Sequence, residues 1–102
     1  MKLEIFVVTT KLKEIGKAEL EMWRTDLTKL FNGITIIPNC SGLWLNDNKQ
    51  IEKDNLEIWL IYTTKEQYFI NETVFLLTLR AIKSLTQQKT QAYAIDNTIK
   101  FF

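Results

Sequence analysis

The segment Gly33–Thr63 constrains the fold more than any other part of the sequence, because it has the pattern of a β-hairpin. β-Branched and aromatic runs flank a cluster of turn-forming residues at Leu45–Lys49, which is typical of two strands folded back on each other. One helical pattern lies on each side of this hairpin, with a further strand predicted at Leu3–Val8 and another at Gln91–Ile95. The order strand, helix, strand, strand, helix, strand is the split βαβ plan of ferredoxin-like folds. We therefore predict an α+β sandwich, in which two helices cover one face of an antiparallel sheet.

The two helices are predicted from the spacing of apolar residues. In Lys17–Phe31 these residues recur at intervals of three, four and seven, which indicates an amphipathic helix. It should end next to Gly33, since glycine tolerates the left-handed conformation that closes helices. A start near Asn71 is predicted for the second helix, because asparagine can accept hydrogen bonds from the first free amides. Trp23 and Leu77 are expected to be buried against the sheet.

Length and composition predict one domain. The chain has 102 residues, of which 46% are hydrophobic and 12% aromatic, enough for one compact core and too little for two. We expect a single α+β domain spanning residues 1–102. The turn signal Asp96-Asn97 also indicates a short extra strand at Thr98–Phe102, which would form a terminal hairpin.

Charge and side-chain chemistry exclude several classes of function. Thirteen basic and twelve acidic residues leave a net charge of +1, so the chain has no general attraction to nucleic acid or anionic membranes. Cys40 is the only cysteine and histidine is absent, which excludes an intrachain disulfide, a cysteine-rich zinc site and imidazole catalysis. The N-terminal run Met1–Val8 has the pattern of a strand, and no run approaches the ~18 apolar residues of a membrane span. We expect a cytoplasmic protein with no metal, cofactor, nucleic acid or membrane partner.

One pattern resembles a known group of proteins. The segment Phe31–Pro38, followed by Gly42-Leu43-Trp44 and by a strand ending Leu60-Ile61-Tyr62-Thr63, is similar to small uncharacterised prokaryotic α+β proteins with the pattern F-G-G-x-T-x-x-P-x-x-x-G-x-W. Asn32 stands where that group has its first glycine. The group has no assigned activity, so the resemblance implies a fold and no catalytic residue.

The face of the sheet that the helices leave open is predicted to be an interface. Alternation along the strands assigns Leu3, Ile5 and Val7, with the set Leu56, Ile58, Leu60 and Tyr62, to the helix-covered face. The open face then displays an apolar and aromatic set: Phe6, Val8, Trp59, Ile61 and Tyr93. Large apolar patches usually mark interfaces, so the first hypothesis is a homo-oligomeric interaction or regulatory module.

Two alternatives remain open at this stage. The same aromatic residues could stack on RNA bases, but no RNP1-like string is present, and Glu4 and Glu57 would place negative charge where phosphates must lie. The second alternative is a small enzyme or nucleic-acid-processing protein with an acidic site. The first and third strands are expected to be parallel neighbours, so Glu4 and Glu57 could approach each other and one pKa could rise. Each glutamate could equally pair with Lys2 or Lys100, so the sequence does not decide whether the protein is an enzyme.

Overall fold

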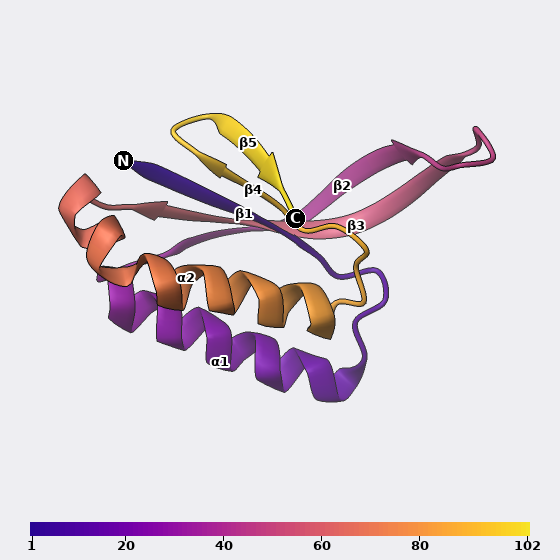
Figure 1. The fold of residues 1–102 in the computed structure, drawn as a ribbon. Helices are drawn as coiled ribbons and strands as arrows, with labels where there is room; N and C mark the ends of the chain where they lie inside the picture. Colours follow the sequence, from indigo (N-terminus) through magenta and orange to yellow (C-terminus); the bar gives the residue numbers. More distant parts are fainter.

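The computed structural model describes residues 1–102 as one α+β domain. Five strands form one antiparallel sheet in the order β2-β3-β1-β4-β5. Both helices lie on the same face of this sheet, and its other face is open (Figure 1). The predicted ferredoxin-like order is confirmed, with β5 as the extra C-terminal strand. The elements are β1 (Lys2–Val8), α1 (Glu14–Phe31), β2 (Thr35–Leu45), β3 (Ile51–Tyr62), α2 (Lys65–Leu85), β4 (Ala92–Ile95) and β5 (Thr98–Phe101).

Helix α1 begins at Glu14, three residues before the predicted Lys17, and ends at the predicted residue. Its last residue is Phe31, and the residue that adopts the left-handed conformation is Asn32, with φ 64°. Asparagine is the residue after glycine that most readily takes this cap position. Trp23 packs against the core but is only half-buried, so its predicted burial is confirmed in part.

Helix α2 starts earlier than predicted and buries a different face. Thr64 caps it by accepting a hydrogen bond from the backbone N–H of Gln67 at 3.1 Å, so the start near Asn71 is wrong. Leu77 is 56% exposed, and its predicted burial is also wrong. The buried residues of the helix are Tyr68, Phe75, Thr78, Leu79 and Ile82.

The main core lies between the helices and the covered face of the sheet. Twelve buried residues form it: Leu3, Ile5, Val7, Leu20, Leu27, Phe31, Trp59, Ile61, Tyr68, Phe75, Leu79 and Ile82. The ring of Phe75 contacts the rings of Phe31, Tyr68 and Tyr93 in edge-to-face geometry, with centroids 5.7 to 6.2 Å apart. Such contacts add to the stabilisation that burial of these large rings provides.

The two faces of β3 are the reverse of the prediction. Ile5 pairs with Trp59 and Leu3 with Ile61, and directly paired residues share a face of the sheet. Trp59 and Ile61 therefore point to the helices, and both are fully buried. Tyr93 also pairs with Ile5 and faces α2.

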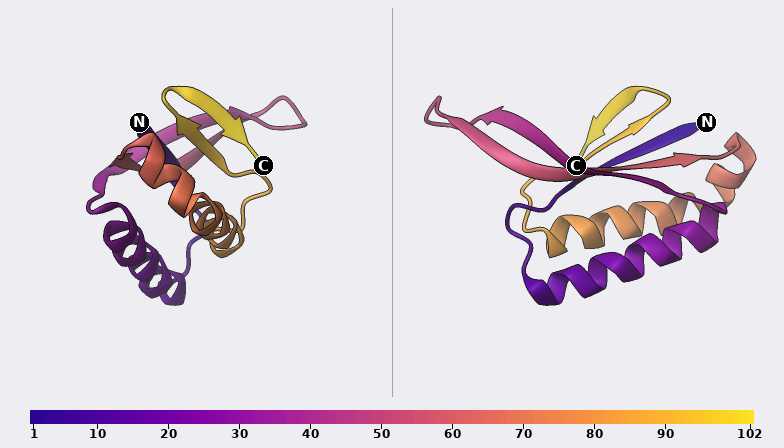
Figure 2. Two further views of the ribbon diagram at one scale, coloured as in Figure 1. Left: turned by 60° about the vertical axis from the view of Figure 1, so that its left-hand side comes forward. Right: turned by 180° about the vertical axis from the view of Figure 1, so that it is seen from behind.

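Strands β2 and β3 continue as a hairpin arm beyond the part of the sheet that the helices cover (Figures 1 and 2). The pairing shifts between Ile37 and Cys40, and Asn39 within this bulge has a positive φ of 59°. A bulge adds an unpaired residue and bends the strand. Here the irregularity separates the helix-covered part of β2 from the arm.

Candidate functional site

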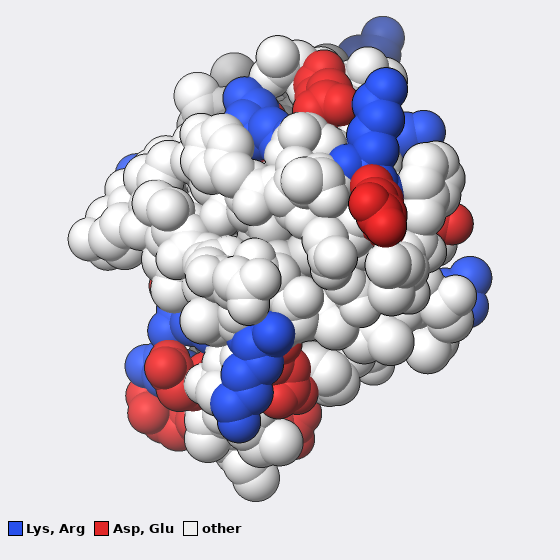
Figure 3. Space-filling view, turned by 90° about the vertical axis from the view of Figure 1, so that its left-hand side faces the viewer, with Lys and Arg blue, Asp and Glu red and all other residues white.

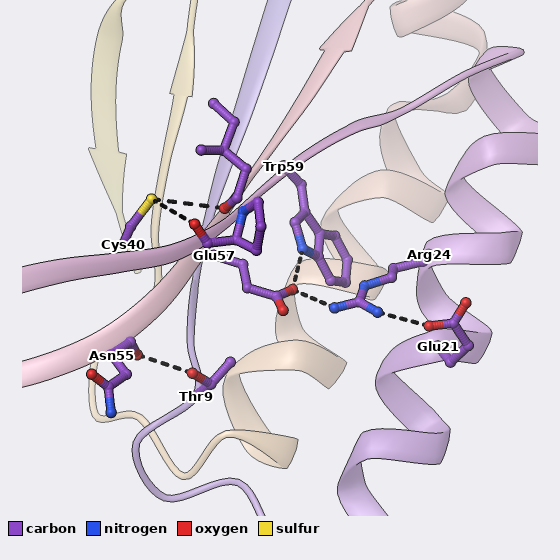
Figure 4. Close-up of polar contacts among 9 residues, drawn as sticks. Thr9, Glu21, Arg24, Cys40, Asn55, Glu57 and Trp59 are labelled. Atoms are coloured by element: carbon purple, nitrogen blue, oxygen red, sulfur yellow. Dashed lines mark hydrogen bonds and ion pairs between the residues drawn. The ribbon is translucent and has the colours of Figure 1, made fainter.

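Glu57 is the acidic residue that the structure places in an organised polar network. It lies on β3 on the helix side of the sheet, because it pairs with Val7. Its Oε1 accepts a hydrogen bond from Nη2 of Arg24 on α1 and another from Nε1 of Trp59, the latter at 2.9 Å. Arg24 Nη1 donates to Glu21 at 2.7 Å. Figure 4 shows the guanidinium between the two carboxylates and beside the indole of Trp59.

The network fixes the charge and orientation of these groups. Burial lowers the pKa of Arg24, but the hydrogen bonds and charges of Glu57 and Glu21 raise it by more, so the net pKa lies above its ordinary value. The guanidinium carbon lies 5.6 Å from the centre of the Trp59 ring, within the range of a cation–π contact. Arg24 thus stays charged. One arm of its guanidinium holds the Glu57 carboxylate and the other holds that of Glu21.

A polar cleft of about 390 Å³ adjoins this carboxylate. Two of its walls are tied together at the end of β1, where Thr9 Oγ1 donates to the backbone oxygen of Asn55 at 3.2 Å. The Cys40 thiol lies 3.7 Å from the carbonyl oxygen of Ile37. Most of the lining groups are hydroxyls, amides and the carboxylate: Thr9, Asn39, Cys40, Ser41, Asn55, Leu56 and Glu57. This set can exchange hydrogen bonds with a polar ligand.

A second cleft, of about 530 Å³, lies where α1 ends and α2 begins. Its lining combines apolar side chains with threonine hydroxyls and amide groups: Phe31, Asn32, Gly33, Ile34, Thr35, Leu60, Tyr62, Thr63, Thr64 and Gln67. Its only titratable side chain is the Tyr62 phenol. This cleft therefore lacks the carboxylate that could act as a general acid or base in the cleft beside Glu57.

The predicted pairing of Glu4 with Glu57 is wrong. β1 and β3 run antiparallel, and Glu4 pairs with Leu60 while Glu57 pairs with Val7. The two carboxylates therefore lie on opposite faces of the sheet and at different levels along it. Glu4 forms an ion pair with Lys2 at 3.3 Å, one of the two lysine partners that the sequence suggested.

The open face of the sheet keeps an apolar surface, although with a different set of residues. Of the five residues predicted for it, the structure places Phe6 and Val8 there and Trp59, Ile61 and Tyr93 on the helix side. The pairing register adds Leu56, Ile58, Leu60 and Tyr62 from β3, Ile37 from β2, and Ile99 and Phe101 from β5. Prediction missed the β3 members because that strand is apolar on both sides, so alternation alone could not choose between them. We call the set Phe6, Ile37, Ile58, Leu60, Tyr62, Ile99 and Phe101 the open-face patch. Val8 and Leu56 point to the same side of the sheet but are already buried within the subunit.

Clusters of metal-binding side chains and membrane-spanning helices are both lacking. No group of three or more His, Cys, Asp or Glu side chains lies close enough together to hold a metal ion. Neither helix combines the length and apolarity that crossing a membrane requires.

Comparison with known proteins finds solved structures with a similar fold. Neither the protein-family models nor the curated protein sequences include a match to this chain. Among solved structures, a phage SAM lyase in complex with S-methyl-5′-thioadenosine is 10% identical, with a TM-score of 0.64 over 99% of this chain and 87% of the lyase. The divalent cation tolerance protein CutA1 of Thermus thermophilus is 15% identical, with a TM-score of 0.53 over 100% of this chain and 82% of that protein.

CutA1 from Oryza sativa gives a similar result, with 14% identity and a TM-score of 0.53 over 99% of this chain and 77% of the plant protein. At these identities the likeness shows the fold alone. The chain has the ferredoxin-like architecture of these proteins, and its activity has to be argued from its own residues.

Proposed function

We propose that the protein is a homo-oligomeric interaction module whose subunits assemble through the open-face patch. The observation that carries this proposal is that a five-stranded sheet has helices on one face only, while its other face is apolar across β1, β3 and β5. A sheet in a soluble domain normally buries an apolar face against a second layer. A second copy of the same chain supplies such a layer with a surface of matching chemistry.

The size of the patch supports this use. With strands ~4.8 Å apart and a rise of ~3.4 Å per residue, three strands over the length of β1 and the two shorter strands β4 and β5 cover roughly 470 Å² in projection. Two such faces together would bury about 1,000 Å², which is the lower limit for a specific interface. The charges at its end, Lys2 and Glu4, neutralise each other and do not oppose contact with a second copy.

A competing apolar surface exists on α2, where Phe69, Ile70, Val74 and Leu77 are exposed. Figure 3 shows uncharged surface across the middle of this end of the molecule, with charged side chains gathered above and below it. Nine helical residues cover a strip about 14 Å long and about 10 Å wide, roughly 140 Å². This is several times smaller than the open face, which is why the open face is the proposed interface.

A matched pair of phenylalanine variants tests the proposal. Phe101 on the open face is 64% exposed and Phe69 on α2 is 69% exposed, so each can be replaced by aspartate with little direct cost to the subunit. Light scattering over a dilution series should give the parent a mass that is a multiple of 12.0 kDa. Phe101→Asp should weaken assembly at least tenfold, because it buries an unpaired charge, whereas Phe69→Asp should leave assembly unchanged. A parent that stays monomeric at about 100 μM, or dissociation caused by Phe69→Asp alone, would overturn the proposal.

The second candidate function is cleavage of S-adenosylmethionine. Two observations favour it over other enzyme activities. The phage SAM lyase matches nearly the whole chain with a TM-score of 0.64, and this chain carries a fixed carboxylate, Glu57, at the edge of a polar cleft. A carboxylate held in this way can position a substrate or accept a proton.

Incubation with S-adenosylmethionine tests this second function. The bond between the sulfonium and the four-carbon amino-acid chain breaks, and the carboxylate oxygen of that chain forms the new bond, so the products are S-methyl-5′-thioadenosine and homoserine lactone. We expect mass spectrometry to detect both products, and we expect Glu57→Gln to slow their formation. Glu4→Gln is the control, because Glu4 lies on the opposite face of the sheet. Absence of product with the folded parent, or equal rates for Glu57→Gln and the parent, would remove this candidate.

A further inference from the structure

The cleft beside Glu57 is the feature of the molecule whose lining most narrowly defines a ligand. We propose that it binds the vicinal hydroxyls of an uncharged or cationic ligand of nucleoside size. This inference deepens the second candidate function and rests on it only for the choice of a nucleoside as probe. The contact with the hydroxyls follows from the lining of the cleft itself.

The first step is the state of the Glu57 carboxylate. Both hydrogen bonds that it accepts from the chain, from Arg24 and Trp59, end on Oε1 (Figure 4). Oε2 accepts from no group of the chain, and Glu57 lines the cleft. A carboxylate with one oxygen fixed and the other free is a preorganised acceptor for a hydroxyl donor. An acidic side chain fulfils this role for ribose in dinucleotide-binding proteins.

Second, other polar side chains beside Glu57 could also form hydrogen bonds with the hydroxyls of a ligand. Ser41 pairs with Asn55 across β2 and β3, so their side chains point to the same side of the sheet as that of Glu57. One hydroxyl, one amide and one carboxylate offer both donors and acceptors. A vicinal diol presents two adjacent hydroxyls that each donate and accept, and it matches this lining better than an apolar group does. A volume of about 390 Å³ falls within the range of small-molecule sites.

The third step is charge. The network contains two carboxylates, Glu21 and Glu57, and one guanidinium, Arg24, so its net formal charge is −1. A phosphate group brought to this site would meet a negative charge with no free cation in the network, since both arms of the Arg24 fork are already used. The site therefore favours a nucleoside over a nucleotide.

Titration of the ¹⁵N-labelled full chain with adenosine tests the inference without any turnover. We expect saturable shifts of the amide signals of Ser41, Asn55 and Glu57. Binding of 2′-deoxyadenosine, which lacks the diol, should be at least tenfold weaker, and binding of ADP should be weaker than that of adenosine. Ser41→Ala, an exposed change outside the core, and Glu57→Gln should each weaken adenosine binding, while Glu4→Gln should not.

Several results would overturn the inference. These are equal binding of adenosine and 2′-deoxyadenosine, tighter binding of ADP, shifts confined to the cleft around Asn32 and Gln67, or no shift at about 10 mM adenosine. If Glu57→Gln fails to fold, Ser41→Ala decides. Adenosine binding in this cleft together with no cleavage of S-adenosylmethionine would support the inference and exclude the second candidate function. Cleavage of S-adenosylmethionine together with equal binding of adenosine and 2′-deoxyadenosine would overturn the inference and support the second candidate function.

Discussion

Two leucines on α2, two positions apart, test the packing of the helix against the sheet. Leu79 is fully buried, whereas Leu77 is more than half exposed. Truncation of leucine to alanine removes three carbon atoms, and at about 0.8 kcal/mol per buried CH₂ the lost transfer free energy is about 2.4 kcal/mol. The cavity left in the core raises this to about 2–5 kcal/mol for Leu79→Ala. Leu77→Ala should change the free energy of unfolding by less than about 1 kcal/mol.

Urea unfolding followed by circular dichroism measures both changes, since a shift in midpoint at constant slope reports stability. Dilute protein should be used, so that assembly does not contribute to the midpoint. Because the two variants share the same chemistry and helix, differences in helix propensity cancel. Equal destabilisation by the two variants, or a larger effect of Leu77→Ala, would refute the observed register of α2.

Two further predictions concern the polar and titratable groups. Arg24→Met leaves the partly buried Glu57 carboxylate without its cation and should lower the free energy of unfolding in urea by about 1–3 kcal/mol. The double variant Arg24→Met/Glu57→Gln should recover part of this stability. Losses that simply add in the double variant would contradict the pairing. Burial, assisted by the charge of Glu72, raises the pKa of Tyr68 to about 12. The stabilisation linked to Tyr68 is therefore complete below its unfolded pKa of about 10 and is lost as the pH rises through about 12. Phenolate absorbance should show a titration near pH 12 that Tyr68→Phe removes. A parent without that titration would contradict the burial of Tyr68.

The order of elements could be predicted because local signals fix it. Turn residues after Leu45, apolar periodicity in α1 and the turn Asp96-Asn97 each act over a few residues. The same kind of signal could also have given the start of α2. Thr64 and Gln67 match the S/T-x-x-E/Q capping box, and Thr64 does cap the helix in the structure. The prediction chose Asn71 instead. Separately, it placed Leu77 on the buried stripe, because α2 has apolar residues on more than one side and periodicity did not decide which side meets the sheet.

The candidate site could be predicted only in part, because it depends on how strands pair. In β3, Ile58 and Leu60 alternate with Trp59 and Ile61, so both faces are apolar and periodicity does not decide which one meets the helices. The pairing with β1 decides it, and that pairing is a long-range property. The predicted approach of Glu4 to Glu57 failed for the same reason, because the pairing of β1 with β3 places the two carboxylates on opposite faces. The contact of Glu57 with Arg24 joins residues 33 positions apart and has no local signature in the sequence.

The central claim is that the open face of the sheet is covered by another copy of the chain in solution. Carbene footprinting of the intact protein, read out residue by residue by mass spectrometry, measures this directly. In the assembled protein we expect weak labelling of Ile99 and Phe101 and strong labelling of Ile70 on α2, because Ile70 is similarly exposed in the subunit. When dilution dissociates the assembly, the labelling of Ile99 should increase. Strong, concentration-independent labelling of Ile99 and Phe101, equal to that of Ile70, would contradict it.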